Sequence, residues 1–310
     1  MRAGRRTAVD SIRALRDDVY SQPKALDGFI PQRPLSGAAQ KRAIFCGSGD
    51  SLAACMLASA HSGMAARSAD PLDLLRNPPI PRSTDAYIVS ISGRTVSNIR
   101  VARLSRRAVA ITSNPHSRLT RSCGRTIRLM FPNSDVLTAG SVSFLDSALT
   151  CMSLVGPVGI RGARKIFARA ESASRRITLQ NRVFILGGLQ TYPLAMYAAA
   201  KLHEVLGMPA HYERTEQFSH MGLFSAKKGD TVLVLERHSG HSERLVRGLR
   251  GAGLRAIQPD PGPCGRTGEF LFYTFLSQLV PLHIAEQEGR QECHFMESKR
   301  LLALSDGMIY

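Results

Sequence analysis

The chain alternates between short apolar runs of strand-forming residues and longer stretches with helical periodicity. The strand-like runs cover residues 43–46, 86–90, 108–112, 126–130, 183–186 and 231–235. Stretches with apolar residues at helical spacing follow several of these runs, as at 52–60, 96–104 and 193–206. Strands that alternate with helices in this way predict an α/β fold, with parallel sheets that are covered by helices on both faces.

The pattern also repeats along the chain. The unit "AIFCGSGDSLAACMLASA" begins at residue 43, and the unit "VFILGGLQTYPLAMYAAAK" begins at residue 183. Each unit contains an apolar strand, a glycine turn and a helix rich in Ala, Leu and Met. The segment "SISGRT" at Ser90 is echoed by "RHSGHS" at Arg237, again after a strand. The repeat predicts two α/β domains of similar plan, joined within residues 156–180.

Composition narrows the class of protein further. Hydrophobic residues make up 44% of the 310 residues, which is typical of a globular chain. The net charge is +17, but the basic residues are spread along the chain, Trp is absent and aromatic residues are 6%. We therefore interpret the charge as a basic surface that favours anionic substrates, and we do not expect specific nucleic-acid binding.

Other sequence features predict location and cofactor needs. No apolar run is long enough for a membrane span, and no secretory signal is visible, so we expect a cytoplasmic protein with no membrane contact. The six cysteines include no C-x-x-C pair, and reduced thiols are expected. No cluster of His, Cys and carboxylates has the spacing of metal ligands, so neither a metal nor another cofactor is predicted.

The segment "SISGRT" gathers hydroxyl groups at the point where a strand ends and a helix begins. Ser90, Ser92 and Thr95 surround one glycine there, and Gly47-Ser48-Gly49-Asp50-Ser51 forms a second turn after an earlier strand. In open parallel sheets, ligands bind where strand ends meet helix N-termini, whose free N–H groups suit an anion. Helix capping accounts for one hydroxyl but not for the whole group. We therefore predict a phosphate-binding loop.

These two motifs resemble those of the sugar isomerase (SIS) family of phosphosugar-binding domains. That family has a G-x-G-x-S turn after its first strand and an S-x-S-G-x-T loop after a later one. The resemblance implies two tandem SIS domains, each a parallel sheet flanked by helices in a flavodoxin-like three-layer sandwich. The implied boundaries are an N-terminal helical segment at 1–38, SIS domains at 39–165 and 180–290, and a C-terminal tail over the site at 291–310. The implied phosphate- and sugar-binding residues are Gly49, Asp50, Ser51, Ser90, Ser92 and Thr95.

Two SIS subfamilies are similar in more detail. Residues 19–26, "VYSQPKAL", resemble the opening of the isomerase domain of glucosamine-6-phosphate synthase. That domain has a "KLKE" segment with a His sixteen residues later; here "KLHE" ends at Glu204, and His220 follows sixteen residues on. The archaeal bifunctional phosphoglucose/phosphomannose isomerases are similar in length and plan, but the Arg that they place after the fourth strand is missing from "FPNSDVLTAGSVSF". Nothing corresponds to the glutaminase domain of the synthase.

The resemblance implies a role for three residues. Glu204, at the end of an apolar helix, is the expected base that moves a proton between C2 and C1, because partial desolvation makes a carboxylate a stronger base. His220 is expected to open the sugar ring, since imidazole titrates near neutral pH. Lys299 falls where synthase-type enzymes keep a C-terminal lysine. Glu216 is a second candidate for the base, and His203 is interpreted as structural because it points about 100° away from Glu204 on a helix.

The sequence thus predicts an aldose–ketose isomerase that interconverts glucose or mannose 6-phosphate with fructose 6-phosphate through an enediol. One alternative is an isomerase, deaminase or deglycase that acts on an amino-sugar phosphate. Another is a non-catalytic phosphosugar sensor, although such sensors usually carry a DNA-binding helix-turn-helix, for which residues 1–38 leave no room. The expected partners are a small phosphosugar and, because SIS sites often combine two subunits, a second copy of the chain in a homodimer.

Overall fold

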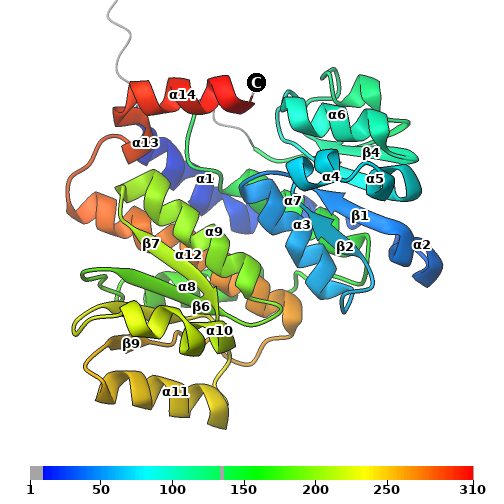
Figure 1. Ribbon diagram of the computed structural model, residues 1–310. Helices are drawn as coiled ribbons and strands as arrows, with labels where there is room; N and C mark the ends of the chain where they lie inside the picture. Colours follow the sequence, from blue (N-terminus) through cyan, green and yellow to red (C-terminus); the bar gives the residue numbers. More distant parts are fainter. Residues whose placement is uncertain (1–9, 133–135, 310) are drawn as a thin grey trace, which may run out of the picture.

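The computed structural model describes residues 10–132 and 136–309, and within them it contains two separate parallel sheets (Figure 1). The first sheet has the strand order β2-β1-β3-β4-β5, and the second has the order β7-β6-β8-β9. Every strand pair is parallel. The strands of the first sheet are β1 (Ala43–Cys46), β2 (Arg67–Ala69), β3 (Asp85–Val89), β4 (Arg107–Thr112) and β5 (Arg125–Arg128). Those of the second are β6 (Val183–Gly187), β7 (Ala210–Arg214), β8 (Thr231–Val234) and β9 (Arg255–Ile257).

Helices cover the sheets, which confirms the predicted α/β class. In the first part of the chain they are α1 (Ser11–Ala25), α2 (Gly37–Arg42), α3 (Asp50–His61), α4 (Pro71–Arg76), α5 (Pro79–Ser83), α6 (Val96–Leu104) and α7 (Val142–Ser153). In the second part they are α8 (Ala163–Ser174), α9 (Tyr192–Lys201), α10 (Thr215–His220), α11 (Gly240–Gly251), α12 (Arg266–Gln287), α13 (His294–Glu297) and α14 (Lys299–Ile309). Short 3-10 turns lie at Leu26–Gly28, Thr120–Ser122 and Gly222–Ser225, and a π turn lies at Leu202–Leu206.

The apolar runs in the sequence become the central strands. Every residue of β1 and β6 is buried, because helices pack on both faces of these strands. The edge strands β2, β7 and β9 were not predicted. β2 and β9 have three residues each, and the exposed residues of β2 and β7 interrupt any apolar run. Sequence periodicity therefore finds the middle of each sheet and one edge strand, β5, and misses the other three edge strands.

A shared layer of helices joins the two sheets. Helices α3 and α9 pack against each other, and α12 packs against α1, α8 and α9. One continuous apolar core contains residues from both parts of the chain, and Figure 1 shows this layer between the sheets. Leu57 of α3, Leu194 of α9 and Phe275 of α12 belong to it. Within the described ranges, no helix is long and apolar enough to cross a membrane.

Candidate active site

The strand order brings two loops of the first sheet together. Strands β2 and β3 lie on opposite sides of β1, so the connections that leave β1 and β3 run in opposite directions. An order of this kind opens a crevice at the carboxyl ends of β1 and β3, where ligands of doubly wound sheets bind. The turn at residues 47–51 follows β1, and the hydroxyl-rich loop at 90–95 follows β3. The two motifs therefore meet at one edge of the sheet.

Neighbouring residues fix the conformation of the loop at 90–95 through hydrogen bonds and a close contact. The hydroxyls of Thr112 and Ser113 donate hydrogen bonds to the Ile91 carbonyl at 2.9 and 3.0 Å. Gly93 has a φ of +63°, and a Cβ atom there would lie 2.2 Å from the Ser117 hydroxyl oxygen. Only glycine fits this conformation and this contact. The loop is thus preformed.

The hydroxyls of this loop are not used as an ordinary helix cap. Thr95 is the N-cap residue of α6, but its side chain makes no capping hydrogen bond. Its hydroxyl oxygen lies 3.5 Å from that of Ser90, and Ser92 Oγ accepts from the Arg94 N–H at 3.3 Å. Three hydroxyls therefore remain close to the start of an uncapped helix, as the predicted anion site requires.

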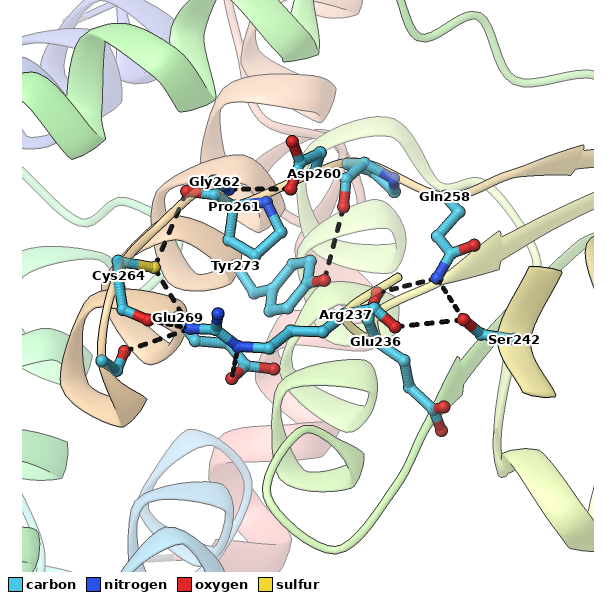
Figure 2. A network of polar contacts seen from close by, with 12 residues as sticks. Glu236, Arg237, Ser242, Gln258, Asp260, Pro261, Gly262, Cys264, Glu269 and Tyr273 are labelled. Atoms are coloured by element: carbon cyan, nitrogen blue, oxygen red, sulfur yellow. Dashed lines mark hydrogen bonds and ion pairs between the residues drawn. The ribbon is translucent and has the colours of Figure 1, made fainter. Parts of the chain in front are cut away.

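The corresponding loop of the second sheet is built differently. Ser239 caps α11 and forms a capping box with Ser242, in which each side chain accepts from the other residue's N–H. Arg237 also has a partner within this half of the chain, because its Nε lies 2.7 Å from Glu269 Oε2. Figure 2 shows this contact. The carboxylate of Glu236 points away from this network and accepts from the hydroxyl of Thr215. Capped hydroxyls and a carboxylate make this edge unsuitable for a phosphate.

Asp50 does not point at the hydroxyl-rich loop but at a lysine of the other half of the chain. Lys201 Nζ, at the end of α9, lies 2.8 Å from Asp50 Oδ2 and also donates to Glu204 Oε2. The Lys201 side chain is 1% exposed, whereas those of Asp50 and Glu204 are 23% and 36% exposed. One buried ammonium thus serves two carboxylates, one from each half of the chain.

This cluster alters the ionisation of its members. Burial raises the pKa of the Asp50 carboxyl to about 6, against the opposing effect of the Lys201 ammonium. Burial disfavours the charge on Lys201, but the two carboxylates outweigh that effect and raise the pKa of the ammonium well above its usual value. Lys201 is therefore always charged, and Asp50 changes its charge near pH 6.

A second layer of contacts fixes this cluster in place. A Cβ atom at Gly140 would lie 2.4 Å from Asp50 Oδ2, so residue 140 must be glycine for Asp50 to reach Lys201. The carbonyl of Gly140 accepts from the Tyr197 hydroxyl at 2.7 Å, and that hydroxyl accepts from Gln278 Nε2 at 2.9 Å. The Tyr197 ring lies 5.0 Å from Lys201 Nζ. Each contact limits where the ammonium can sit.

Glu204 lies in the π turn that continues α9. Such turns are rare and are frequent at functional sites. His203, beside it, lies with Nε2 3.1 Å from the Ala210 carbonyl, in agreement with a structural role. The turn ends at Gly207, whose φ is +65°, and a Cβ there would lie 2.6 Å from the His294 ring. The C-terminal segment thus packs directly against the turn that carries Glu204.

A cavity of about 350 Å³ borders Glu204. One wall is the segment 138–140, and the other is formed by α13 and α14, which Figure 1 places at the top of the molecule. The lining residues are Thr138, Ala139, Gly140, Glu204, His294, Phe295, Ser298, Leu301, Leu302 and Ser305. The tail predicted to lie over the site is therefore next to the predicted base. A larger cavity of about 710 Å³, beside His61, contains none of the predicted site residues.

Two predicted catalytic residues lie apart from this cavity. His220 is at the end of α10 with its side chain 66% exposed, and its Nε2 lies 3.5 Å from Glu216 Oε1. Lys299 is exposed at the first residue of α14, and it does not line the cavity, although its neighbour Ser298 does. Within one copy of the chain, the structure does not bring either residue to Glu204. Glu216 is equally remote from the cavity, with its side chain 73% exposed.

Lys201 and Gly140 were missed by sequence reasoning. A signal for Lys201 was present, because a single lysine in "AAAKLHE" interrupts an apolar helix three residues before an acidic one. The sequence carried no such signal for Gly140, because the need for glycine there comes from its close contact with Asp50, which is far away in the sequence. Among the described residues, no group of three or more His, Cys, Asp or Glu side chains is arranged to hold a metal ion.

Part of the chain matches a known domain family in sequence, and nearly the whole chain is similar to solved structures in fold. Residues 176–259 match the SIS domain. This match covers the second sheet, while the hydroxyl-rich loop belongs to the first. Comparison with curated proteins gave no match.

Three solved structures share the fold of this protein over nearly the whole chain. Glucosamine-6-phosphate deaminase from Thermotoga maritima superposes with a TM-score of 0.72 at 18% identity, over 91% of this chain and 96% of that one. The C-terminal domain of glucosamine-fructose-6-phosphate aminotransferase from Francisella tularensis gives 0.69 at 16% identity, over 94% and 99%. Tagatose-6-phosphate ketose/aldose isomerase from Escherichia coli gives 0.62 at 16% identity, over 89% and 88%. The chain is similar to these proteins in fold.

Proposed function

We propose that this protein is an aldose–ketose isomerase of hexose 6-phosphates, built from two tandem SIS domains. The observation that carries the proposal is the position of Glu204: a carboxylate held by a buried ammonium at the edge of a cavity. A carboxylate in that setting accepts the proton from C2 of the open-chain aldose and returns it to C1, while a second proton moves between O1 and O2. General bases of this kind contribute about 10²–10⁴ in rate.

The phosphate group binds, in this proposal, at the carboxyl edge of the first sheet. Ser90, Ser92 and Thr95 donate hydrogen bonds to its oxygens, and Gly49 and Ser51 line the facing turn. Charge-assisted hydrogen bonds contribute about 1.5–3 kcal/mol each, so a few of them hold the ligand. In this proposal Asp50 does not bind the phosphate, because it bonds to Lys201 and its negative charge would repel phosphate.

Ring opening requires His220, which lies outside the cavity of its own chain. We propose that a homodimer brings His220 of one copy to the Glu204 of the other. The exposure of His220 supports this arrangement, since an exposed side chain is free to enter a neighbouring site. Lys299 is exposed at the start of α14, next to the cavity-lining Ser298, and in this proposal it meets the open-chain sugar.

A second candidate function is chemistry on an amino-sugar phosphate, by the same base. Two of the structures with this fold are named for glucosamine 6-phosphate or its synthesis. Proton NMR of the protein with fructose 6-phosphate in D₂O tests the main proposal. Deuterium at C2 of an aldose phosphate is the expected result. Ammonia released from glucosamine 6-phosphate, without exchange on fructose 6-phosphate, would favour the second candidate. If neither reaction is observed, the result would favour a non-catalytic phosphosugar sensor.

A further inference from the structure

The larger cavity, beside His61, is the counterpart of the cavity beside Glu204 in the internal repeat of the chain. His61 and Lys201 occupy the same place in the two repeated units, at the ends of α3 and α9. The cavity beside Glu204 lies between the segment before α7 and the segment after α12. The cavity beside His61, of about 710 Å³, lies between the start of α12 and the segment after α7. The two halves of the chain thus build two related cavities.

The two cavities differ in charge. The described residues that line the cavity beside His61 include no Asp or Glu, and three of them are basic: Arg161, Lys165 and Arg266. Those that line the cavity beside Glu204 include that carboxylate and neither lysine nor arginine. The cavity beside His61 therefore has no carboxylate to act as a general base, and its positive charge suits the binding of an anion.

The basic side chains of this cavity have no acidic partner within the described part of the chain. Carboxylates near them are paired with other arginines. Arg164 Nη2, on α8, lies 2.6 Å from Asp27 Oδ2, and Arg237 Nε lies 2.7 Å from Glu269 Oε2 on α12 (Figure 2). No described residue forms an ion pair with the three basic residues of the lining, Arg161, Lys165 and Arg266. An anion in the cavity would therefore meet three cations that no carboxylate already neutralises.

The walls of this cavity are fixed by contacts between distant segments. The Gly159 N–H donates to the Thr267 hydroxyl at 3.2 Å, which joins the segment after α7 to the start of α12. A Cβ atom at Gly268 would lie 3.3 Å from Ile166 Cδ1, so α8 and α12 approach each other closely at their starts. Neither helix has a capping side chain. The partial positive charges of two helix N-termini thus add to the charge of the basic side chains.

We propose that the cavity beside His61 is a second anion site, which binds its ligand through a diphosphate group. A single phosphate group carries a charge of about −2 at neutral pH, which leaves the three cations incompletely balanced. A diphosphate carries more negative charge, and its two phosphoryl groups are shared between Arg266 of α12 and the pair Arg161 and Lys165 at the start of α8. This site is separate from the loop at 90–95, and the proposal does not depend on the isomerase activity.

Calorimetric titration with inorganic pyrophosphate and with inorganic phosphate, at fixed salt and without divalent cations, tests this proposal. Pyrophosphate should bind more tightly than phosphate. Arg266→Gln should weaken pyrophosphate binding by about tenfold or more, because a charge-assisted contact is lost. The matched control is Arg164→Gln, which removes the same charge beside Lys165. Since Arg164 is paired with Asp27 and does not line the cavity, this variant should keep the affinity within about twofold.

The outcomes separate this site from the phosphosugar site. Absence of pyrophosphate binding, or equal weakening in the two arginine variants, would overturn the proposal, because net charge alone would then account for any attraction. Pyrophosphate binding that is lost in Ser92→Ala and unchanged in Arg266→Gln would also overturn it, since the anion would then lie at the loop. Phosphate that binds as tightly as pyrophosphate would overturn the diphosphate assignment. Absence of fructose 6-phosphate binding would contradict the proposed function and leave this site standing.

Discussion

Lys201 Nζ lies 2.8 Å from Asp50 Oδ2, and this ion pair joins α3 of the first half of the chain to α9 of the second. Lys201 also bonds to Glu204, the predicted base. A change in the position or the charge of Asp50 therefore affects Glu204 through the ammonium that both carboxylates share. Asp50 is thus a positioning residue for Glu204. In the proposed mechanism it acts on Glu204 through Lys201 and does not contact the substrate.

The charge of Asp50 should set the acid side of the pH–activity profile. Burial raises its pKa to about 6, so Asp50 gains a proton as the pH falls through 6 and no longer balances Lys201. Lys201 then keeps Glu204 as its one charged partner in the cluster, and the balanced arrangement that positions Glu204 is lost. We expect activity to fall below pH 6 in the wild type. Asp50→Asn should lower kcat by about tenfold at pH 7.5 and should lose the step near pH 6. An unchanged profile in this variant would remove Asp50 from the account.

Gly140 should matter for activity although its own side chain is a hydrogen atom. In Gly140→Ala, the added methyl group would lie 2.4 Å from Asp50 Oδ2 and would force that carboxylate away from Lys201. We expect a loss of kcat of at least the size expected for Asp50→Asn, with phosphosugar affinity within a few-fold of wild type. Gly124→Ala is the control, because nothing lies within 4 Å of its Cβ position and its φ is not positive. Equal kinetics in the two variants would contradict the assigned role of Gly140.

The two serine loops should respond differently to the same substitution. Ser92→Ala or Thr95→Ala should weaken phosphosugar binding by about tenfold or more, because each loses a charge-assisted bond of about 1.5–3 kcal/mol. Stability should change little. Ser239→Ala, in the second sheet, should instead lower the free energy of unfolding by about 1 kcal/mol through loss of the α11 cap, with affinity unchanged. Calorimetry measures the change in phosphosugar affinity, and urea unfolding measures the change in stability. A loss of affinity in Ser239→Ala, with unchanged affinity in Ser92→Ala and Thr95→Ala, would place the phosphate at the second loop.

A site shared between two copies predicts complementation. Glu204→Gln and His220→Ala homodimers should each be inactive on cyclic glucose 6-phosphate. When the two variants are unfolded together and refolded, half of the dimers are mixed, and each mixed dimer has one site with both residues intact. Activity should return to about a quarter of the wild-type level. No recovery, in a mixture shown by native mass spectrometry to contain mixed dimers, would mean that His220 does not act across the interface.

The sequence was informative where structure is local. Apolar runs predicted the strands β1, β3, β4, β5, β6 and β8, of which all but β5 are largely buried, and helical spacing predicted α3, α6 and α9. The loop at 90–95 was readable because its hydroxyls, its glycine and the following helix are contiguous. The edge strands β2, β7 and β9 were not readable, since β2 and β9 have only three residues each and β7 has no buried residue.

What the sequence could not predict depends on contacts between distant segments. Asp50 and Lys201 are 151 residues apart, and nothing in the turn at 47–51 indicates that its carboxylate faces a lysine. The family spacing of Glu204 and His220 suggested one shared site, but the chain turns back after β7 and leaves His220 exposed on α10. Spacing along the sequence therefore does not establish proximity in space.

Exchange of the C2 proton of the sugar tests the central claim most directly. Glu204→Gln keeps the size of the side chain and can still accept from Lys201, but it cannot take up the proton. With fructose 6-phosphate in D₂O, deuterium incorporation measured by proton NMR should be slower than in the wild type by about 10²–10⁴, with affinity within a few-fold. Glu216→Gln, whose carboxylate is exposed on α10, should exchange at nearly the wild-type rate. Near wild-type exchange by Glu204→Gln would contradict the account, because the base would then lie elsewhere.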